Sequence, residues 1–109
     1  MTVFHPVAYF FGGAFLANAV PHFTSGVMGR RFPTPFANPP GRGLSSPTAN
    51  VLWGALNIAI GYLLASCVGD FQPSALGDTG SLGLGALLMG LFLARHFGGL
   101  HEDQAQGRS

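Results

Sequence analysis

Amide and imidazole side chains recur at helical spacing in an otherwise apolar chain, and such groups bind a polar ligand or pair with one another. Asn18 and His22 are four residues apart, which puts both on one face of a helix. Asn50 and Asn57 are seven apart and share a face in the same way. We therefore predict a polar pocket formed by these four candidate ligand-binding residues. The alternative, which the pattern favours slightly, is a structural cluster that only locks helices together.

Two histidines raise the possibility of a haem or metal site, because imidazole is a common ligand of both. His22 and His96 are expected at similar depth, near Asn50. No third ligand stands at a metal-binding spacing. We therefore predict neither a metal nor another cofactor, and keep a haem- or metal-binding electron-transfer subunit as an alternative.

Nucleophilic catalysis is harder to build from this chain. Cys67 is expected at the opposite end of a helix from His22 and His96, roughly 25 Å away at 1.5 Å per residue. That separation is far beyond hydrogen-bond reach. Phosphate-binding loops, zinc-ligand spacings and hydrolase motifs are absent from the sequence. The sequence predicts a protein that is not an enzyme.

The composition is that of a membrane protein. The 109 residues are 48% hydrophobic and 8% charged, against roughly 25% charged in an ordinary soluble domain. A soluble fold of this size could not cover its surface with so few charges. The net charge of +1 and the lack of lysine argue against a nucleic-acid partner.

Three segments are long enough to cross a bilayer, for which a helix needs about 20 mostly apolar residues. They are residues 3–28, 47–69 and 78–97. The first is expected to continue through a kink at Pro21, because proline is tolerated where nearby polar groups bond the freed backbone. The predicted fold class is an all-α integral membrane protein with three transmembrane helices.

Residues that favour helix ends flank these segments, since Ser, Thr and Asp cap N-termini and Gly ends helices. We expect starts at Ser46-Pro47 and at Asp78 or Thr79, and ends at Gly29 and at Gly98-Gly99. Residues 1–99 then form a three-helix transmembrane domain with a Pro-rich cytoplasmic loop over 30–46. Residues 100–109 are expected to form a disordered polar cytoplasmic tail.

The arginines set the orientation, because basic residues in short loops stay in the cytoplasm. The first loop and the C-terminal region hold all five basic residues, and the N-terminus and second loop hold none. We predict an N-terminus outside and a C-terminus inside the plasma (inner) membrane. Ala17-Asn18-Ala19 is typical of a signal-peptidase site, but cleavage there would leave three arginines outside, so we expect an uncleaved span.

The Pro-rich loop is expected to be extended and stiff, since proline forbids helix and restricts the residue before it. Its rings and cations suit a headgroup region, where Phe rests and Arg meets lipid phosphate. A rigid docking surface for a partner protein is the less favoured interpretation. The predicted lipid or partner contacts are Arg30, Arg31, Phe32, Phe36 and Arg42.

Small residues at helical spacing predict close helix packing, which drives association in lipid. On the second span the stripe also carries both asparagines, so an interior face is expected there. The predicted packing residues are Gly13 and Ala17 on the first span, Gly54, Gly61 and Ala65 on the second, and Ala86 and Gly90 on the third.

The favoured function is therefore a small inner-membrane protein that acts by association, as an accessory subunit or oligomeric scaffold without catalysis of its own. Membrane lipids and either a homo-oligomer or a larger membrane-protein complex are the expected partners. The alternative is a small homo-oligomeric channel or transporter with a polar inner-leaflet pocket, although no ionisable residue lies mid-span.

Overall fold

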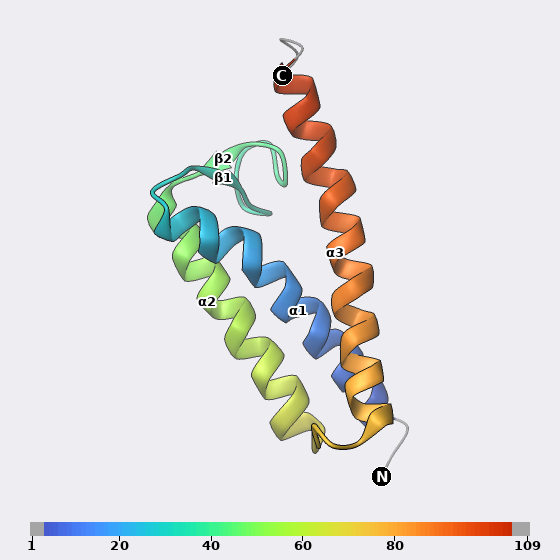
Figure 1. Ribbon diagram of the computed structural model, residues 1–109. Helices are drawn as coiled ribbons and strands as arrows, with labels where there is room; N and C mark the ends of the chain where they lie inside the picture. Colours follow the sequence, from blue (N-terminus) through green and yellow to red (C-terminus); the bar gives the residue numbers. More distant parts are fainter. Residues whose placement is uncertain (1–3, 106–109) are drawn as a thin grey trace.

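Three helices form an open bundle in the computed structural model, which describes residues 4–105, and the second runs antiparallel to the other two (Figure 1). The helices are α1 (Phe4–Val27), α2 (Pro47–Leu63) and α3 (Leu76–Ala105), and a π-helical turn η1 (Leu64–Val68) continues α2. Helix α1 lies between the other two and packs extensively against both, whereas α2 and α3 make little contact with each other. The first helix is therefore the centre of the bundle.

Two of the helices are long and apolar enough to cross a membrane. They are Pro47–Val68, with a mean hydropathy of 1.8, and Leu76–Asp103, with 1.4. Helix α1 does not reach this level, because its 24 residues include His5, Asn18 and His22 among the apolar ones. The prediction of membrane-crossing helices is thus supported for α2 and α3, and a third span is not supported by hydropathy.

The end of α1 and the start of α2 lie where the sequence predicts. Helix α1 runs through Pro21 and stops before Gly29, whose φ of 73° is the left-handed conformation that glycine adopts readily. The Arg30 N–H donates to the Ser25 carbonyl and the Gly29 N–H to the Gly26 carbonyl, which closes the helix end. At α2, the Ser46 hydroxyl accepts from the Ala49 N–H, and Pro47 occupies the first turn.

Helix α3 is longer at both ends than the predicted 78–97. It begins at Leu76, and Asp78 lies in its first turn, where the carboxylate accepts the Gln72 N–H and so ties the preceding loop to the helix. Neither Asp78 nor Thr79 is the cap. Gly98 and Gly99 do not end the helix, because both keep helical geometry.

Tertiary contacts explain the C-terminal extension of α3. Each helical glycine costs about 1 kcal/mol relative to alanine, but Leu100 beyond them is buried. Arg42 of the loop also lies 4.0 Å from Asp103. The expected disordered tail is therefore helical through Ala105, and residues 106–109 lie outside the described part of the chain.

The Pro-rich loop folds back over the bundle. Its ends pair as two short antiparallel strands, β1 (Phe32–Pro33) and β2 (Leu44–Ser45), with Phe32 opposite Ser45. The Thr34 and Ser45 hydroxyls hydrogen-bond at 2.6 Å, and Thr34 is buried. The proline pattern of the sequence does not predict this strand pairing or the contact of the loop with the bundle.

Glycines set the distance between the helices. An added Cβ at Gly13 of α1 would overlap the Leu82 carbonyl of α3, and one at Gly85 of α3 would overlap the Phe10 carbonyl. On α2, a Cβ at Gly54 would come within 2.7 Å of the Phe23 nitrogen, and one at Gly61 within 2.9 Å of the Gly12 oxygen. Such close backbone approach is possible only without a side chain.

The face that α3 turns toward α1 differs from the predicted one. It carries Gly85 and Ala86, whose nitrogen is 3.1 Å from a Cβ built at Gly13, but not Gly90, where an added Cβ meets nothing within 4 Å. Gly90 makes no close helix contact within the described residues, and its predicted packing role stays a prediction. The contact with α1 is made by Leu82 and by the residues three and four positions after it, Gly85 and Ala86, which lie on one side of the helix. Ala65 is buried, while Ala17 is only partly covered.

The two kinds of glycine on α3 give a matched test. Gly85→Ala should lower the free energy of unfolding by about 1–3 kcal/mol, because the methyl group forces the Phe10 backbone away. Gly83→Ala, in open space, should raise it by up to about 1 kcal/mol through helix propensity alone. Titration with a denaturing detergent in mixed micelles measures both. Equal effects of the two substitutions would contradict this packing.

Candidate functional site

The four candidate polar residues meet at the contact between α1 and α2, in two hydrogen-bonded pairs. The Asn18 amide donates from Nδ2 to the Asn57 Oδ1 at 2.9 Å. The Asn57 amide donates in turn to the Trp53 carbonyl at 2.7 Å, one helical turn earlier. Asn57 is fully buried. This chain of bonds fixes which end of each amide is oxygen.

The second pair lies one turn closer to the loop. His22 Nδ1 and the Asn50 Oδ1 are 2.9 Å apart, and both residues are buried. The Asn50 Nδ2 lies 3.0 Å from the Phe32 carbonyl, 3.1 Å from that of Ser46 and 3.3 Å from that of Ser45. Because the nitrogen of Asn50 faces these carbonyls, its oxygen faces His22, and His22 Nδ1 carries the proton.

Asn50 therefore joins three segments through one side chain. Its oxygen accepts from α1, and its nitrogen donates to both strands of the loop and to the cap of α2. A side chain of another type at position 50 would leave buried donors and acceptors without partners, which costs about 1–3 kcal/mol for each group. Asn50 is the point at which the loop is attached to the bundle.

Aromatic rings enclose the imidazole of His22. The rings of Phe32, Trp53 and Phe97 lie edge-on to it, with centroids 5.5, 6.3 and 6.1 Å away. Phe32 and Phe97 also pack on each other at 4.5 Å. Phe32 therefore links the loop, α1 and α3 but stays partly exposed, and its predicted contact with lipid or a partner stays a prediction.

The remaining predicted contact residues of the loop lie at the surface. Arg30, Arg31 and Arg42 are exposed, and Phe36 is 59% exposed although its ring meets Trp53 edge-on at 5.4 Å. Arg42 and Asp103 are half-exposed, so their ion pair contributes about 0–1 kcal/mol. Their predicted contact with lipid headgroups or another protein stays a prediction.

Two cavities lie beside the polar pairs. The larger, of about 460 Å³, is lined by α1, α2 and α3 and includes Asn18, Trp53 and Asn57. The smaller, of about 340 Å³, lies under the loop and includes Asn18, His22 and His96. His96, which the sequence suggested only as a haem or metal ligand, donates from Nε2 to the Gly41 carbonyl at 2.7 Å and holds the loop over this cavity.

The chemistry of the site follows from these bonds. The amide nitrogens of Asn18 and Asn57 and the Nδ1–H of His22 all donate hydrogen bonds to groups of the chain itself. This favours the interpretation of the cluster as one that only holds the helices together. Among residues 4–105, no three His, Cys, Asp or Glu side chains converge on a point where a metal ion could be held. Cys67 lies exposed on η1, at the far end of α2 from His22.

Trp53 and Phe92 are site residues that sequence reasoning missed. Trp53 lines the larger cavity, and Phe92 lines both. Trp53 precedes Asn57 by four residues, so helical spacing alone could have placed it on the same face. Phe92 gives no such signal, because its place depends on how α3 rotates against α1.

Comparison of the chain with protein-family models, with curated proteins and with solved structures finds no significant match.

A double-mutant cycle tests whether the asparagine pair holds α1 to α2. Asn18→Leu and Asn57→Leu should each lower the free energy of unfolding by about 1–3 kcal/mol, because each strands the other amide. The double variant should lose less than the sum, with a coupling energy of about 0.6–2 kcal/mol. Detergent-induced unfolding measures all three. Ile58, which is 44% exposed, supplies the control, since Ile58→Leu should be additive with Asn18→Leu. If the effects of Asn18→Leu and Asn57→Leu were also additive, the pairing of the two asparagines would be contradicted.

Proposed function

We propose that the protein is a three-span inner-membrane protein that acts by association, as an accessory subunit or an oligomeric scaffold without catalysis of its own. The observation that carries this proposal is a face of small residues on α3 that no other part of residues 4–105 covers. The hydrogen bonds of α1, the positions of the charged residues and the open face of α3 support it in turn.

Helix α1 is proposed as a third span although its hydropathy falls short. It lies between two helices that are apolar enough to cross a membrane, so it shares their environment. The groups that lower its hydropathy are those that pair with α2, Asn18 with Asn57 and His22 with Asn50. A paired amide costs little in lipid, because its hydrogen bonds remain satisfied.

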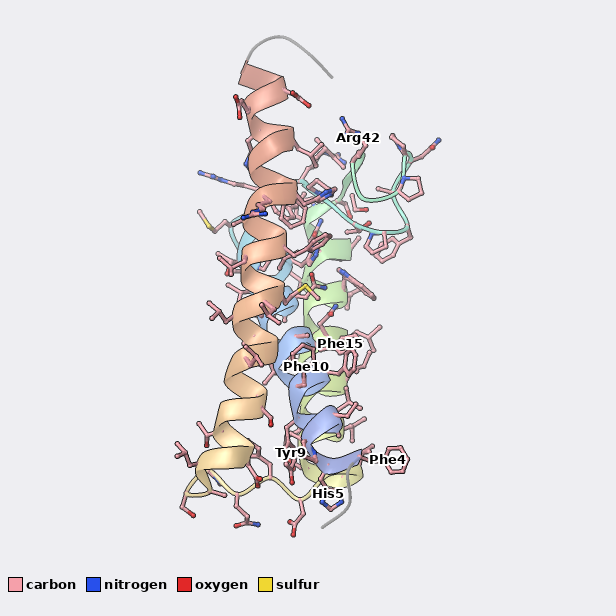
Figure 2. All side chains as sticks on the ribbon, turned by 90° about the vertical axis from the view of Figure 1, so that its right-hand side faces the viewer. Phe4, His5, Tyr9, Phe10, Phe15 and Arg42 are labelled. Atoms are coloured by element: carbon pink, nitrogen blue, oxygen red, sulfur yellow. The ribbon has the colours of Figure 1, made fainter. Side chains whose placement is uncertain are left out.

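The charges support an orientation with the N-terminus outside. The loop with Arg30, Arg31 and Arg42 lies at the same end of the bundle as the second half of α3 with Arg95 (Figure 1). Figure 2 shows Arg42 at this end and Phe4 and His5 at the other. Basic residues in short loops stay in the cytoplasm, so the loop end is the cytoplasmic one.

The uncovered face of α3 is a surface for another helix. An added Cβ at Gly80, Gly83, Gly90 or Gly98 meets nothing within 4 Å, and Ala94 is exposed. At 3.6 residues per turn these five positions fall on one side of the helix, away from Gly85. A second helix can pack closely into a groove of small residues, and the van der Waals contact that results favours helix association over contact with lipid.

The orientation can be tested by thiol labelling. Cys67, exposed on η1, should react with an impermeant maleimide added outside sealed cells, since η1 lies at the end opposite the arginines. In a Cys67→Ser background, Leu44→Cys should stay unlabelled, because Leu44 is 52% exposed but at the cytoplasmic end. Labelling at position 44 and protection at 67 would reverse the orientation.

The association can be tested on α3 with two glycines that are both open within the chain. Gly90→Leu, in the small-residue face, should reduce the associated fraction by about tenfold, because leucine fills the groove. Gly77→Leu, outside that face, should leave it unchanged. Light scattering of the protein in mild detergent gives the mass.

The composition of the associated species distinguishes the two forms of the proposal. A homogeneous mass larger than that of one chain, with this polypeptide alone, would indicate an oligomeric scaffold. A second polypeptide present in stoichiometric amount would indicate an accessory subunit. A monomeric wild type without a partner, or equal effects of the two leucines, would contradict the proposal.

A further inference from the structure

The two cavities beside the polar pairs adjoin each other. Asn18 and Phe92 line both of them, so they meet where these side chains lie. Their volumes of about 460 and 340 Å³ are those of sites that bind small organic molecules. No Arg, Asp or Glu lines either cavity. A ligand there would be uncharged, since an anionic or cationic head would have no counter-charge.

The smaller cavity offers hydrogen-bond acceptors. Asn18 uses its nitrogen for Asn57, so its oxygen is open. His22 Nδ1 carries the proton that bonds Asn50, so in the neutral ring Nε2 is an acceptor. His96 Nε2 donates to the Gly41 carbonyl, so its Nδ1 is an acceptor. Among the described residues, these three acceptor atoms are not fully enclosed without a partner, so a ligand can reach them.

The larger cavity contributes one donor. The indole N–H of Trp53 is fully enclosed and has no hydrogen-bond partner in the described part of the chain. Trp53 and Asn18 line the same cavity. A hydroxyl group between them would accept from the indole and donate to the Asn18 oxygen, whereas a carbonyl group could do only the first. Buried unpartnered donors are costly, and a ligand relieves that cost.

The walls fit a flat ring joined to an apolar chain. Phe92, His96 and Phe97 border the smaller cavity, and the rings of Phe92 and His96 are nearly parallel, 5° apart, with centroids 6.0 Å from each other. The larger cavity is apolar, with Phe10, Phe15 and Leu88 among its walls. Aromatic walls suit an aromatic head, and the apolar groove suits an unbranched or prenyl chain.

We propose that these two cavities bind an isoprenoid quinol, with its hydroxyl-bearing ring at Asn18, His22 and His96 and its chain along the groove between α2 and α3. The quinol supplies the hydroxyl donors that the acceptor groups require, and the quinone does not. The proposal relies on the bundle lying in a membrane and does not depend on its association with other chains.

The only tryptophan of the chain reports on binding, because Trp53 lines the larger cavity. Decylubiquinol, kept reduced under anaerobic conditions, should quench the fluorescence of the detergent-solubilised protein saturably. Decylubiquinone should bind about tenfold more weakly, as expected for the loss of a hydrogen bond. Equal affinity for the two forms, or quenching that does not saturate, would overturn the proposal.

Two adjacent leucines of α3 give the matched control. Leu88 lines the larger cavity, and Leu87, comparably exposed, lines neither. Leu88→Phe should weaken decylubiquinol binding by about tenfold by narrowing the groove, and Leu87→Phe should leave it unchanged. Helical circular dichroism confirms that each variant is folded. Equal effects of the two substitutions would overturn the site.

Competition distinguishes the quinol from other lipids with the same hydroxyl chemistry. Dioleoylglycerol, a neutral hydroxyl lipid, and dioleoylphosphatidylglycerol, an anionic one, should not displace decylubiquinol at equimolar concentration. Displacement by dioleoylglycerol would overturn the quinol and assign the site to a neutral glycerolipid. Displacement by the anionic lipid would contradict the uncharged ligand altogether.

Discussion

A buried amide must find its hydrogen bonds inside the protein, and the arrangement of this bundle depends on how four side chains meet that requirement. Asn18 pairs with Asn57 and His22 with Asn50, and each pair joins α1 to α2. In an apolar surrounding an unpaired group of this kind is costly, so rotation or sliding of α1 against α2 is penalised. Glycines then allow the backbones to approach until these bonds reach 2.9 Å.

The same constraint extends from the helices to the loop. Asn50 has one oxygen and one nitrogen, and it uses the oxygen for α1 and the nitrogen for carbonyls at Phe32, Ser45 and Ser46. His96 of α3 holds the loop at Gly41. The loop is thereby a cover on the smaller cavity, fixed on one side by α2 and on the other by α3. Position 50 is where packing of the bundle and the shape of the cavity are coupled.

Much of this fold can be predicted from local rules. The spacing of Asn18 and His22, the cap at Ser46-Pro47 and the stop at Gly29 each depend on residues within one or two turns. Helix α3 departs from prediction because its end depends on remote contacts. Leu100 is buried and Arg42 approaches Asp103, so two glycines that would otherwise end a helix remain inside it.

The parts of the site that escape prediction depend on rotation and on the loop. The sequence presents several small-residue faces on α3, and only packing against Phe10 and Gly13 selects the one with Gly85. The position of Phe32 among arginines and prolines predicts contact with lipid or a partner, but it gives no sign that the strand pairing also places the ring against His22 and Phe97. Phe92 borders both cavities because of how α3 is rotated against α1, which the sequence pattern does not show.

We propose that α1 lies in the membrane because its polar groups are paired, and the depth of its midsection tests this most directly. A nitroxide at Phe11, which is 50% exposed, is introduced by Phe11→Cys in a Cys67→Ser background and measured in lipid vesicles by power saturation. Leu56→Cys on α2 and Leu44→Cys on the loop serve as references, at 49% and 52% exposure. At a membrane-embedded position 11 we expect frequent collision with oxygen and rare collision with a water-soluble nickel chelate, as at position 56. Nickel accessibility equal to that at position 44 would contradict it.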